Sequence, residues 1–229
     1  PVVHTNELVR PLRLSGFFDT TAQKTFPTAD GAITVPDNVW FHRCNNNSWF
    51  WFTYIDDTSI TYAGGGTPIS HSGNKSVVIY TAANADAAKY SSHANNLEHL
   101  QGVAQRLSLD DSKKYKLQFF YYRPNLVWGT TNVAANINHA EKIVVGIVSS
   151  TGANVNTDYT YEKVITLEKT EGWKEYNITF DLPDIIQKNP GKSFEKCAIF
   201  FNIVPEIDSA QKTLKTLVNL DDISLTETK

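Results

Sequence analysis

Residues 115–123 read YKLQFFYYR, a run of aromatic and apolar residues that alternates with a period of two. In a β-strand, alternate side chains share a face. The strand therefore divides into two sets, which are Leu117, Phe119 and Tyr121 on one face and Gln118, Phe120 and Tyr122 on the other. Because aromatic rings occur on both faces, we expect one face in a buried core and the other at a binding surface. The alternative is that long loops fold over the second face and bury it.

The same period recurs along most of the chain and predicts an all-β protein. Segments rich in Val, Ile, Phe and Tyr are typical of strands, and they lie at 76–80, 142–149, 163–167, 174–180, 197–204 and 217–226, with further strands expected at 12–18, 39–42, 50–54 and 103–107. Only residues 82–100 have any helical spacing, and their apolar residues are mostly Ala. Two antiparallel sheets packed face to face bury alternate residues of such strands, so the sequence predicts a β-sandwich.

A single domain covering residues 1–229 is expected. The chain has 229 residues, which is within the range of single all-β sandwiches. It contains no internal repeat, low-complexity tract or linker rich in Pro, Gly and Ser. Three connections, at 55–72, 81–102 and 124–141, are longer than usual, and long loops are often functional.

Composition and charge exclude several classes of protein. The formal net charge is −3 and Lys and Arg are scattered singly, so no basic surface for nucleic acid is expected. No apolar run approaches the ~20 residues of a transmembrane helix, and the start at Pro1 has no signal-peptide pattern, which indicates a mature or excised fragment. Abundant Asn, Ser and Thr favour a location outside the cytoplasm. Cys44 and Cys197 are the two cysteines, and spacing alone leaves them either paired or free.

The sequence also lacks the motifs of common enzymes. There is no Gly-x-Ser-x-Gly elbow, His-Glu-x-x-His pair or phosphate-binding glycine loop, and the six histidines lack metal-ligand spacing. A glycosidase needs two carboxylates facing one cleft at about 5–10 Å. Nothing in the sequence pairs the available acids, which are Glu98, Glu141, Asp158 and Glu162. We therefore expect a protein without catalytic activity.

Four stretches match one family pattern in order along the chain. They are NEL at 6–8 with SGFFD at 15–19; HSGNKSV at 71–77; VAQRL at 103–107 with KYKLQF at 114–119; and GWKEY at 172–176 with TF at 179–180 and VNLDDISL at 218–225. Together they resemble the carbohydrate-binding modules of families 4, 9 and 22, within the wider group of galactose-binding-like jelly rolls. The resemblance implies a jelly-roll β-sandwich of two antiparallel sheets that binds polysaccharide or oligosaccharide. The three long loops depart from a minimal module.

The resemblance further implies a structural calcium ion between the opening and closing strands. Asp19 and Asp222 occupy the matching positions, and Asp221 adjoins the second. Calcium takes six to eight oxygen ligands, and the turn at 72–75 could supply carbonyl oxygens. The alternative is that Asp221 and Asp222 accept hydrogen bonds from backbone N–H groups at a strand end.

Sugar recognition needs flat apolar rings together with planar polar groups that orient hydroxyls. The candidate ligand-binding residues lie on the outward set of 115–123 or in long loops, and they are Trp49, Trp51, Tyr54, Gln118, Phe120, Tyr122, Arg123, Trp128, Tyr159 and Tyr161. Trp128 is the best candidate for an exposed platform because its surroundings have no strand pattern. Trp40 and Trp173 are interpreted as core residues.

The predicted function is non-catalytic binding of a plant-type glycan, such as xylan or β-glucan. The chain would be a module of a secreted or surface-anchored glycan-degrading system, bacterial and extracellular, linked to a catalytic domain or a surface anchor. One alternative is a structural or adhesive jelly roll that contacts protein or a neighbouring domain. A glycan-active enzyme of jelly-roll form is the third hypothesis.

Overall fold

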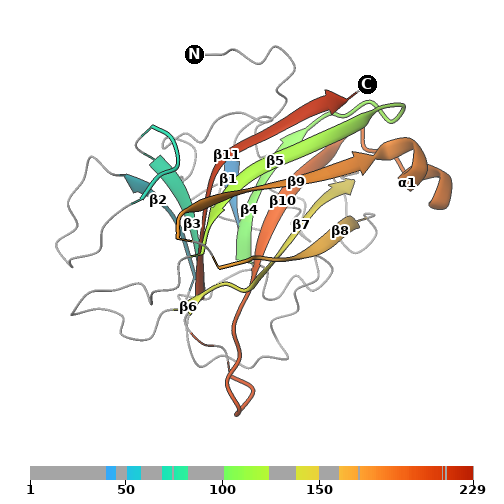
Figure 1. Ribbon diagram of the computed structural model, residues 1–229. Coiled ribbons are helices and arrows are strands. Elements are labelled where there is room, and N and C mark those ends of the chain that lie inside the picture. Colours follow the sequence, from blue (N-terminus) through green and yellow to red (C-terminus); the bar gives the residue numbers. More distant parts are fainter. Residues whose placement is uncertain are drawn as a thin grey trace.

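The computed structural model describes residues 40–44, 51–57, 69–73, 75–81, 101–123, 138–149, 160–169, 171–212, 214 and 216–228. Within these ranges strands dominate and one short helix occurs (Figure 1). The elements are β1 (Trp40–Cys44), β2 (Trp51–Asp57), β3 (Lys75–Thr81), β4 (Gln101–Leu107), β5 (Lys114–Tyr122), β6 (Asn138–His139), β7 (Lys142–Ser149), β8 (Thr160–Thr166), β9 (Trp173–Asp181), α1 (Leu182–Lys188), β10 (Cys197–Val204) and β11 (Thr216–Thr228).

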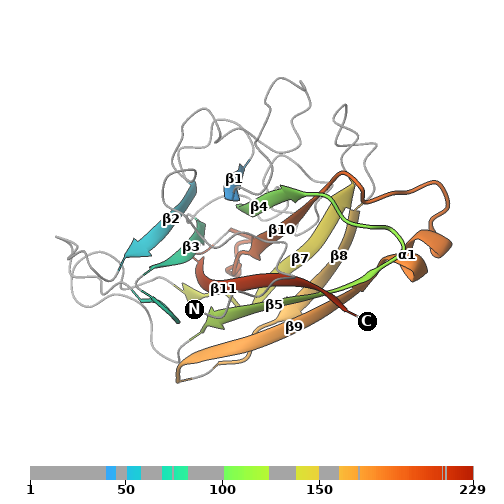
Figure 2. The ribbon, with the colours of Figure 1, turned by 90° about the horizontal axis from the view of Figure 1, so that it is seen from above.

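The strands form two sheets that pack face to face. One sheet has the order β1-β4-β10-β7-β8, and the other has the order β2-β3-β11-β5-β9 with β6 attached to β11. All pairs are antiparallel except β6 with β11, which is parallel. The view from above in Figure 2 shows the two layers. Helix α1 lies in the connection from β9 of one sheet to β10 of the other. The predicted jelly-roll β-sandwich is confirmed.

The core lies between the sheets and is built from alternate residues of each strand. In β5, burial alternates from Tyr115 to Tyr121, as residues 115–123 predict. Phe119 meets Phe201 of β10 edge to face, with ring centroids 5.1 Å apart. Aromatic pairs favour this geometry and bury large areas, so this contact stabilises the packing of one sheet against the other.

Most of the predicted strands are confirmed. All seven stronger segments are strands, and the weaker ones at 39–42, 50–54 and 103–107 correspond to β1, β2 and β4. The expected strand at 12–18 and the segment with helical spacing at 82–100 lie outside the described residues. Helix α1 was not expected, although Asp181 caps it by accepting a hydrogen bond from the Asp184 N–H at 3.2 Å. No helix in the described part of the chain is long and apolar enough to cross a membrane.

The register of β4 separates the two cysteines. Cys44 lies opposite Gln101 at one end of β4, and Cys197 lies opposite Leu107 at the other end. Six residues of strand span about 20 Å, far beyond the ~7 Å between Cα atoms that a disulfide tolerates. Cys197 is accordingly a free, buried thiol.

We predict that Cys197 does not react with thiol reagents in the folded protein. Burial raises the pKa of this thiol, so the reactive thiolate is scarce and inaccessible at pH 8. Alkylation with iodoacetamide, followed by mass spectrometry of the peptide that contains Cys197, should find modification only after unfolding in guanidinium. Modification of the native protein at the rate of an exposed cysteine would contradict this placement.

Candidate functional site

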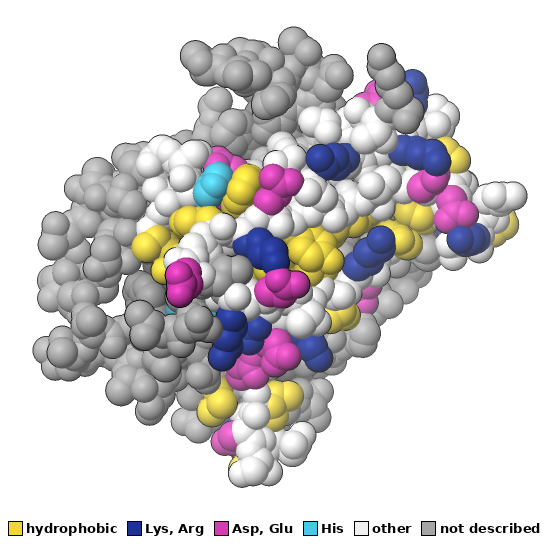
Figure 3. Space-filling model, viewed as in Figure 1, with side chains coloured by type: hydrophobic (Ala, Val, Ile, Leu, Met, Phe, Trp, Pro, Cys, Tyr) yellow, Lys and Arg dark blue, Asp and Glu magenta, His cyan; other side chains and the backbone are white. Residues whose placement is uncertain are grey.

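The outer face of the six-stranded sheet carries the outward side chains of β5 and β9. Across these two strands, Tyr122 lies opposite Trp173, Phe120 opposite Glu175, and Gln118 opposite Asn177. On β5 these side chains are half-buried, whereas their neighbours on the other face are buried. Figure 3 shows the molecule from this side, with hydrophobic side chains among basic and acidic ones.

Four rings gather at one end of this face, and we call them the aromatic cluster. His71 stacks on Phe120 with centroids 3.7 Å apart and an interplanar angle of 14°. Trp173 lies 5.5 Å from Tyr122 and 6.0 Å from His71, measured between centroids. Because His71 covers one face of Phe120, the rings of Trp173, Tyr122 and His71 form the outer part of the cluster.

The position of Trp173 differs from the one expected from the sequence. The sequence favours a core position for this residue, but it is half-buried on the outer face. The alternation of β9 explains this position, because Ile178 and Phe180 are buried and residues at odd positions therefore point outward.

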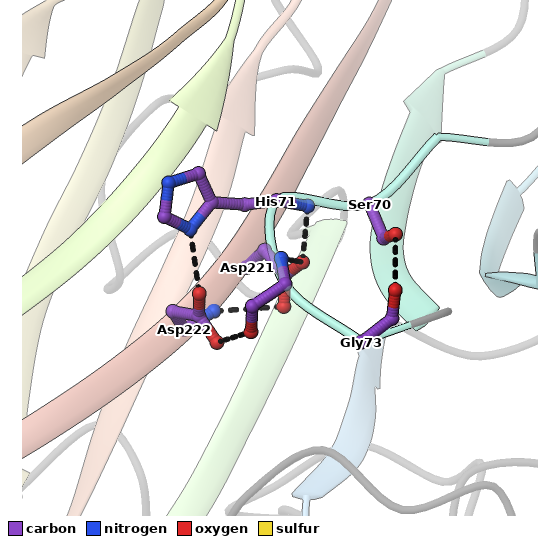
Figure 4. Close-up of polar contacts among 6 residues, drawn as sticks. Ser70, His71, Gly73, Asp221 and Asp222 are labelled. Carbon is purple, nitrogen blue, oxygen red and sulfur yellow. Dashed lines mark hydrogen bonds and ion pairs between the residues drawn. The ribbon is translucent and has the colours of Figure 1, made fainter.

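His71 is held in place by two adjacent carboxylates of β11 (Figure 4). Asp221 Oδ2 accepts hydrogen bonds from the backbone N–H groups of His71, at 2.7 Å, and Ser72, at 3.4 Å. Asp222 Oδ2 lies 2.6 Å from His71 Nδ1, and its Oδ1 accepts a bond from Ser72 Oγ at 2.6 Å. We call this set of contacts the aspartate clamp.

A β-bulge lets both carboxylates reach the same turn. The pairing of β11 with β5 shifts register between Asp221 and Ser224, and Asp222 has a φ of 45°. In a regular strand, adjacent side chains point to opposite faces. The irregularity removes this alternation, and an Asp tolerates positive φ better than most residues.

The Asp221 carboxylate is the buried member of the clamp, with 4% of the residue exposed. Burial raises its pKa, while the backbone N–H groups of His71, Asp222 and Ser72 act in the opposite direction. These donors compensate for much of the cost of removing the carboxylate from water. The alternative interpretation of the Asp pair, as acceptors for backbone N–H groups, therefore describes Asp221.

The described residues alone do not fit a calcium ion. Asp221 Oδ1 accepts the Asp222 N–H at 2.8 Å, so each of the four carboxylate oxygens of the clamp already has a protein partner. Within the described ranges, no group of three or more His, Cys, Asp or Glu side chains is placed to hold a metal ion. Asp19, the third expected ligand, lies outside them. The calcium site stays a prediction.

Five of the predicted ligand-binding residues belong to the six-stranded sheet. Gln118, Phe120 and Tyr122 share the outer face, as expected. Trp51 and Tyr54 belong to β2 of the same sheet. Trp49, Trp128 and Tyr159 lie outside the described residues.

Two of the predicted residues make structural contacts instead of facing outward. Tyr161 packs against the core, where its ring meets Phe180 edge on at 6.1 Å, because it lies opposite Ile147 on the inner face. Arg123 follows β5, and its Nη1 donates a hydrogen bond to the Leu167 carbonyl oxygen. Neither placement favours the predicted contact with sugar.

A buried histidine adjoins the aromatic cluster. His139 is 8% exposed, and its ring meets Tyr122 edge on at 6.1 Å. Neither ring nitrogen has a hydrogen-bond partner among the described residues. Burial, assisted by the positive charge of Arg123, lowers the pKa of His139 to about 4, so the ring is neutral at pH 7.

The sequence does not single out His71 or Trp173 as candidate ligand-binding residues. His71 lies within HSGNKSV and the Asp pair lies within VNLDDISL, but their contact joins positions about 150 residues apart. The two motifs were the available signal. Only knowledge of which strands pair, here β3 with β11, connects them.

Comparison with known proteins finds similarity of fold. No family model and no curated protein matches the chain. A protein from Bacteroides thetaiotaomicron VPI-5482 with a suggested sugar-binding role is 10% identical, with 96% of this chain and 95% of that chain covered and a TM-score of 0.49. The CBM22-2 xylan-binding domain from Paenibacillus barcinonensis is 13% identical, with 87% and 96% covered and a TM-score of 0.46.

A family 4 carbohydrate-binding module is 14% identical to the chain. It covers 77% of this chain, the chain covers 86% of it, and the TM-score is 0.40. Families 4 and 22 are among those that the sequence resembles. At identities of 10–14% the similarity is one of fold.

We predict that Asp221→Asn lowers the free energy of unfolding by roughly 2 kcal/mol, because the amide replaces a charged acceptor that bonds backbone N–H groups. Asp222→Asn is the matched control, and a smaller loss is expected because its side chain is more exposed and Asn tolerates positive φ. Urea unfolding measures both. Equal losses in the two variants would contradict the clamp.

We also predict that His139 weakens the fold in acid. Its folded pKa of about 4 lies below the usual 6.5, so between these values the unfolded chain binds the proton more readily. The free energy of unfolding therefore decreases as the pH falls from about 6.5 to about 4, by at most ~1.4 kcal/mol per pH unit. In urea unfolding at several pH values, His139→Leu should lose this dependence. Parallel curves for the variant and the wild type would refute the assignment.

Proposed function

We propose that the chain binds polysaccharide or oligosaccharide without catalysis, through the outer face of the six-stranded sheet. The observation that carries the proposal is the aromatic cluster, in which Trp173 and Tyr122 lie side by side with centroids 5.5 Å apart. Large rigid rings provide apolar area for the C–H faces of a pyranose at little cost in conformational entropy.

The polar groups needed for hydroxyls follow the aromatic cluster along the same strands. Glu175 occupies the next outward position after Trp173 on β9, and Asn177 on β9 and Gln118 on β5 occupy the outward positions beyond it. Outward residues on one strand are separated by about 6.8 Å, so the face is an extended strip. A strip with rings at one end and planar polar groups beyond them suits an elongated glycan, and the resemblance of the sequence to glycan-binding modules supports the same interpretation.

The wider role that we propose is that of a module in a secreted or surface-anchored glycan-degrading system, acting outside the cytoplasm. A neutral plant-type glycan such as xylan or β-glucan is the proposed ligand. The support is the family resemblance of the sequence and its abundance of Asn, Ser and Thr.

We predict that Tyr122→Ala and Trp173→Ala each weaken glycan binding roughly tenfold, because each removes about 1.5 kcal/mol of ring contact. Affinity electrophoresis through gels with xylan, mannan, mixed-linkage glucan or pectin measures the effect. Val164→Ala, at an exposed position of the other sheet, is the control and should bind as the wild type does.

The outcomes separate the three hypotheses. If one polymer retards the wild type but neither Tyr122→Ala nor Trp173→Ala, the result supports the proposal and identifies the ligand. No retardation by any polymer would favour a structural or adhesive jelly roll. Release of reducing sugar from a polymer would favour an enzyme.

A structural calcium ion bound by Asp19 remains part of the proposal. The clamp carboxylates would have to exchange hydrogen bonds for the ion if they were to join Asp19. A chelator should then lower the melting temperature, added calcium should restore it, and Asp19→Asn should abolish both responses. An unchanged melting temperature under both treatments excludes the metal.

A further inference from the structure

The polar part of the outer face is organised by one hydrogen bond. Asn177 Nδ2 donates to Glu175 Oε1 at 2.5 Å, and both side chains are exposed on β9. A carboxylate oxygen accepts from the amide N–H₂ and repels the amide oxygen, so this bond fixes the orientation of the amide. Asn177 Oδ1 therefore points away from Glu175, and it accepts no hydrogen bond from the part of the chain that the structure describes.

The remaining groups on this part of the face are mainly acceptors. Glu175 has a second carboxylate oxygen, Asn177 presents Oδ1, and the Gln118 amide opposite Asn177 adds another acceptor along with N–H donors. A sugar hydroxyl can donate to these oxygens and also accept from the amides. A ligand carboxylate can only accept, so it finds fewer partners here.

The charge of the face also disfavours the binding of a ligand carboxylate. Glu175 is exposed and has no basic partner among the described residues, whereas the neighbouring Lys174 is paired with Glu168. Asp222, the other acid beside the aromatic cluster, is bonded to His71 and Ser72. Arg123 follows Tyr122, but its Nη1 is bonded to the Leu167 carbonyl oxygen, and the nearest outward cation of β5 is Lys116, which lies opposite Thr179 beyond Gln118. A carboxylate on a ligand in contact with Tyr122 and Trp173 would therefore lie closer to Glu175 than to Lys116.

We infer that Glu175 determines the specificity of this face by discriminating against glycans that carry carboxylates. This inference rests on the proposed function and adds to it a residue and a direction of discrimination. Glu175 does so in two ways, since its charge repels a ligand carboxylate and its bond to Asn177 sets which amide atom faces the ligand.

The test uses matched pairs of polymers that differ in carboxylate content. They are hydroxyethylcellulose with carboxymethylcellulose, arabinoxylan with glucuronoxylan, and methyl-esterified pectin with the same pectin after de-esterification. Relative mobility in affinity electrophoresis at low ionic strength is measured for the wild type, Glu175→Gln and Glu195→Gln. Glu195 is exposed, follows α1 and precedes β10, so its variant removes the same charge away from the face.

The wild type should bind the neutral member of a recognised pair about fivefold more tightly than the carboxylated member. Glu175→Gln, which keeps an acceptor for Asn177, should largely remove this preference by strengthening binding to the carboxylated polymer. Glu195→Gln should keep it. Added salt at 0.5 M should reduce the preference of the wild type, because it screens exposed charges.

Failure of the inference is distinct from failure of the proposed function. If the wild type binds both members of a pair equally, or if Glu175→Gln and Glu195→Gln behave alike, Glu175 has no such role although the glycan-binding function stands. If no polymer of any pair retards the wild type, the proposed function itself is overturned.

Discussion

The buried carboxylate of Asp221 is the group on which the candidate site depends. It accepts the backbone N–H groups of His71 and Ser72 from a turn about 150 residues earlier in the chain. Unpaired backbone N–H groups and an uncompensated carboxylate are both costly in a protein interior, so the turn and β11 stabilise each other. This contact brings the His71 ring onto Phe120, and the stacked pair then forms the side of the aromatic cluster that Trp173 contacts. The position of the cluster is therefore a consequence of backbone hydrogen bonding as much as of the rings themselves.

The β-bulge at Asp222 explains why two adjacent acids can act on one turn. Regular alternation would direct Asp221 and Asp222 to opposite faces of the sheet, and only one of them could reach residues 69–73. With a φ of 45° at Asp222, the second carboxylate approaches the His71 ring and the Ser72 hydroxyl while the first remains buried. The two acids therefore have different roles. Asp221 accepts hydrogen bonds from the backbone N–H groups of the turn, and Asp222 bonds to the side chains of His71 and Ser72.

The strands could be predicted from the sequence because their alternation is local information. The alternation of residues 115–123 predicts Phe119 in the core and Tyr122 outside it. Both positions are found in β5, where pairing with β11 and β9 keeps the strand regular. Helix α1 was missed because its seven residues are too few for a helical period to be visible. The interpretation of Trp173 was wrong because it relied on the surrounding motif and not on the alternation of β9, which gives the correct face. His71 could not be connected with Asp222 because the contact requires the pairing of β3 with β11 and a bulge that alternation does not predict.

The arrangement of the outer face constrains how a ligand can lie on it. Aromatic and polar positions differ along β5 and β9, from Tyr122 and Trp173 at one end to Gln118 and Asn177, with Phe120 opposite Glu175 between them. A ligand that contacts both the Tyr122–Trp173 pair and the Gln118–Asn177 pair therefore runs along the strands. β9 is the edge strand of its sheet, and exposed polar side chains such as Glu175 and Asn177 on an edge also discourage pairing with another chain. The same residues that keep this edge from associating leave the strip beside it open to an elongated, hydroxyl-rich molecule.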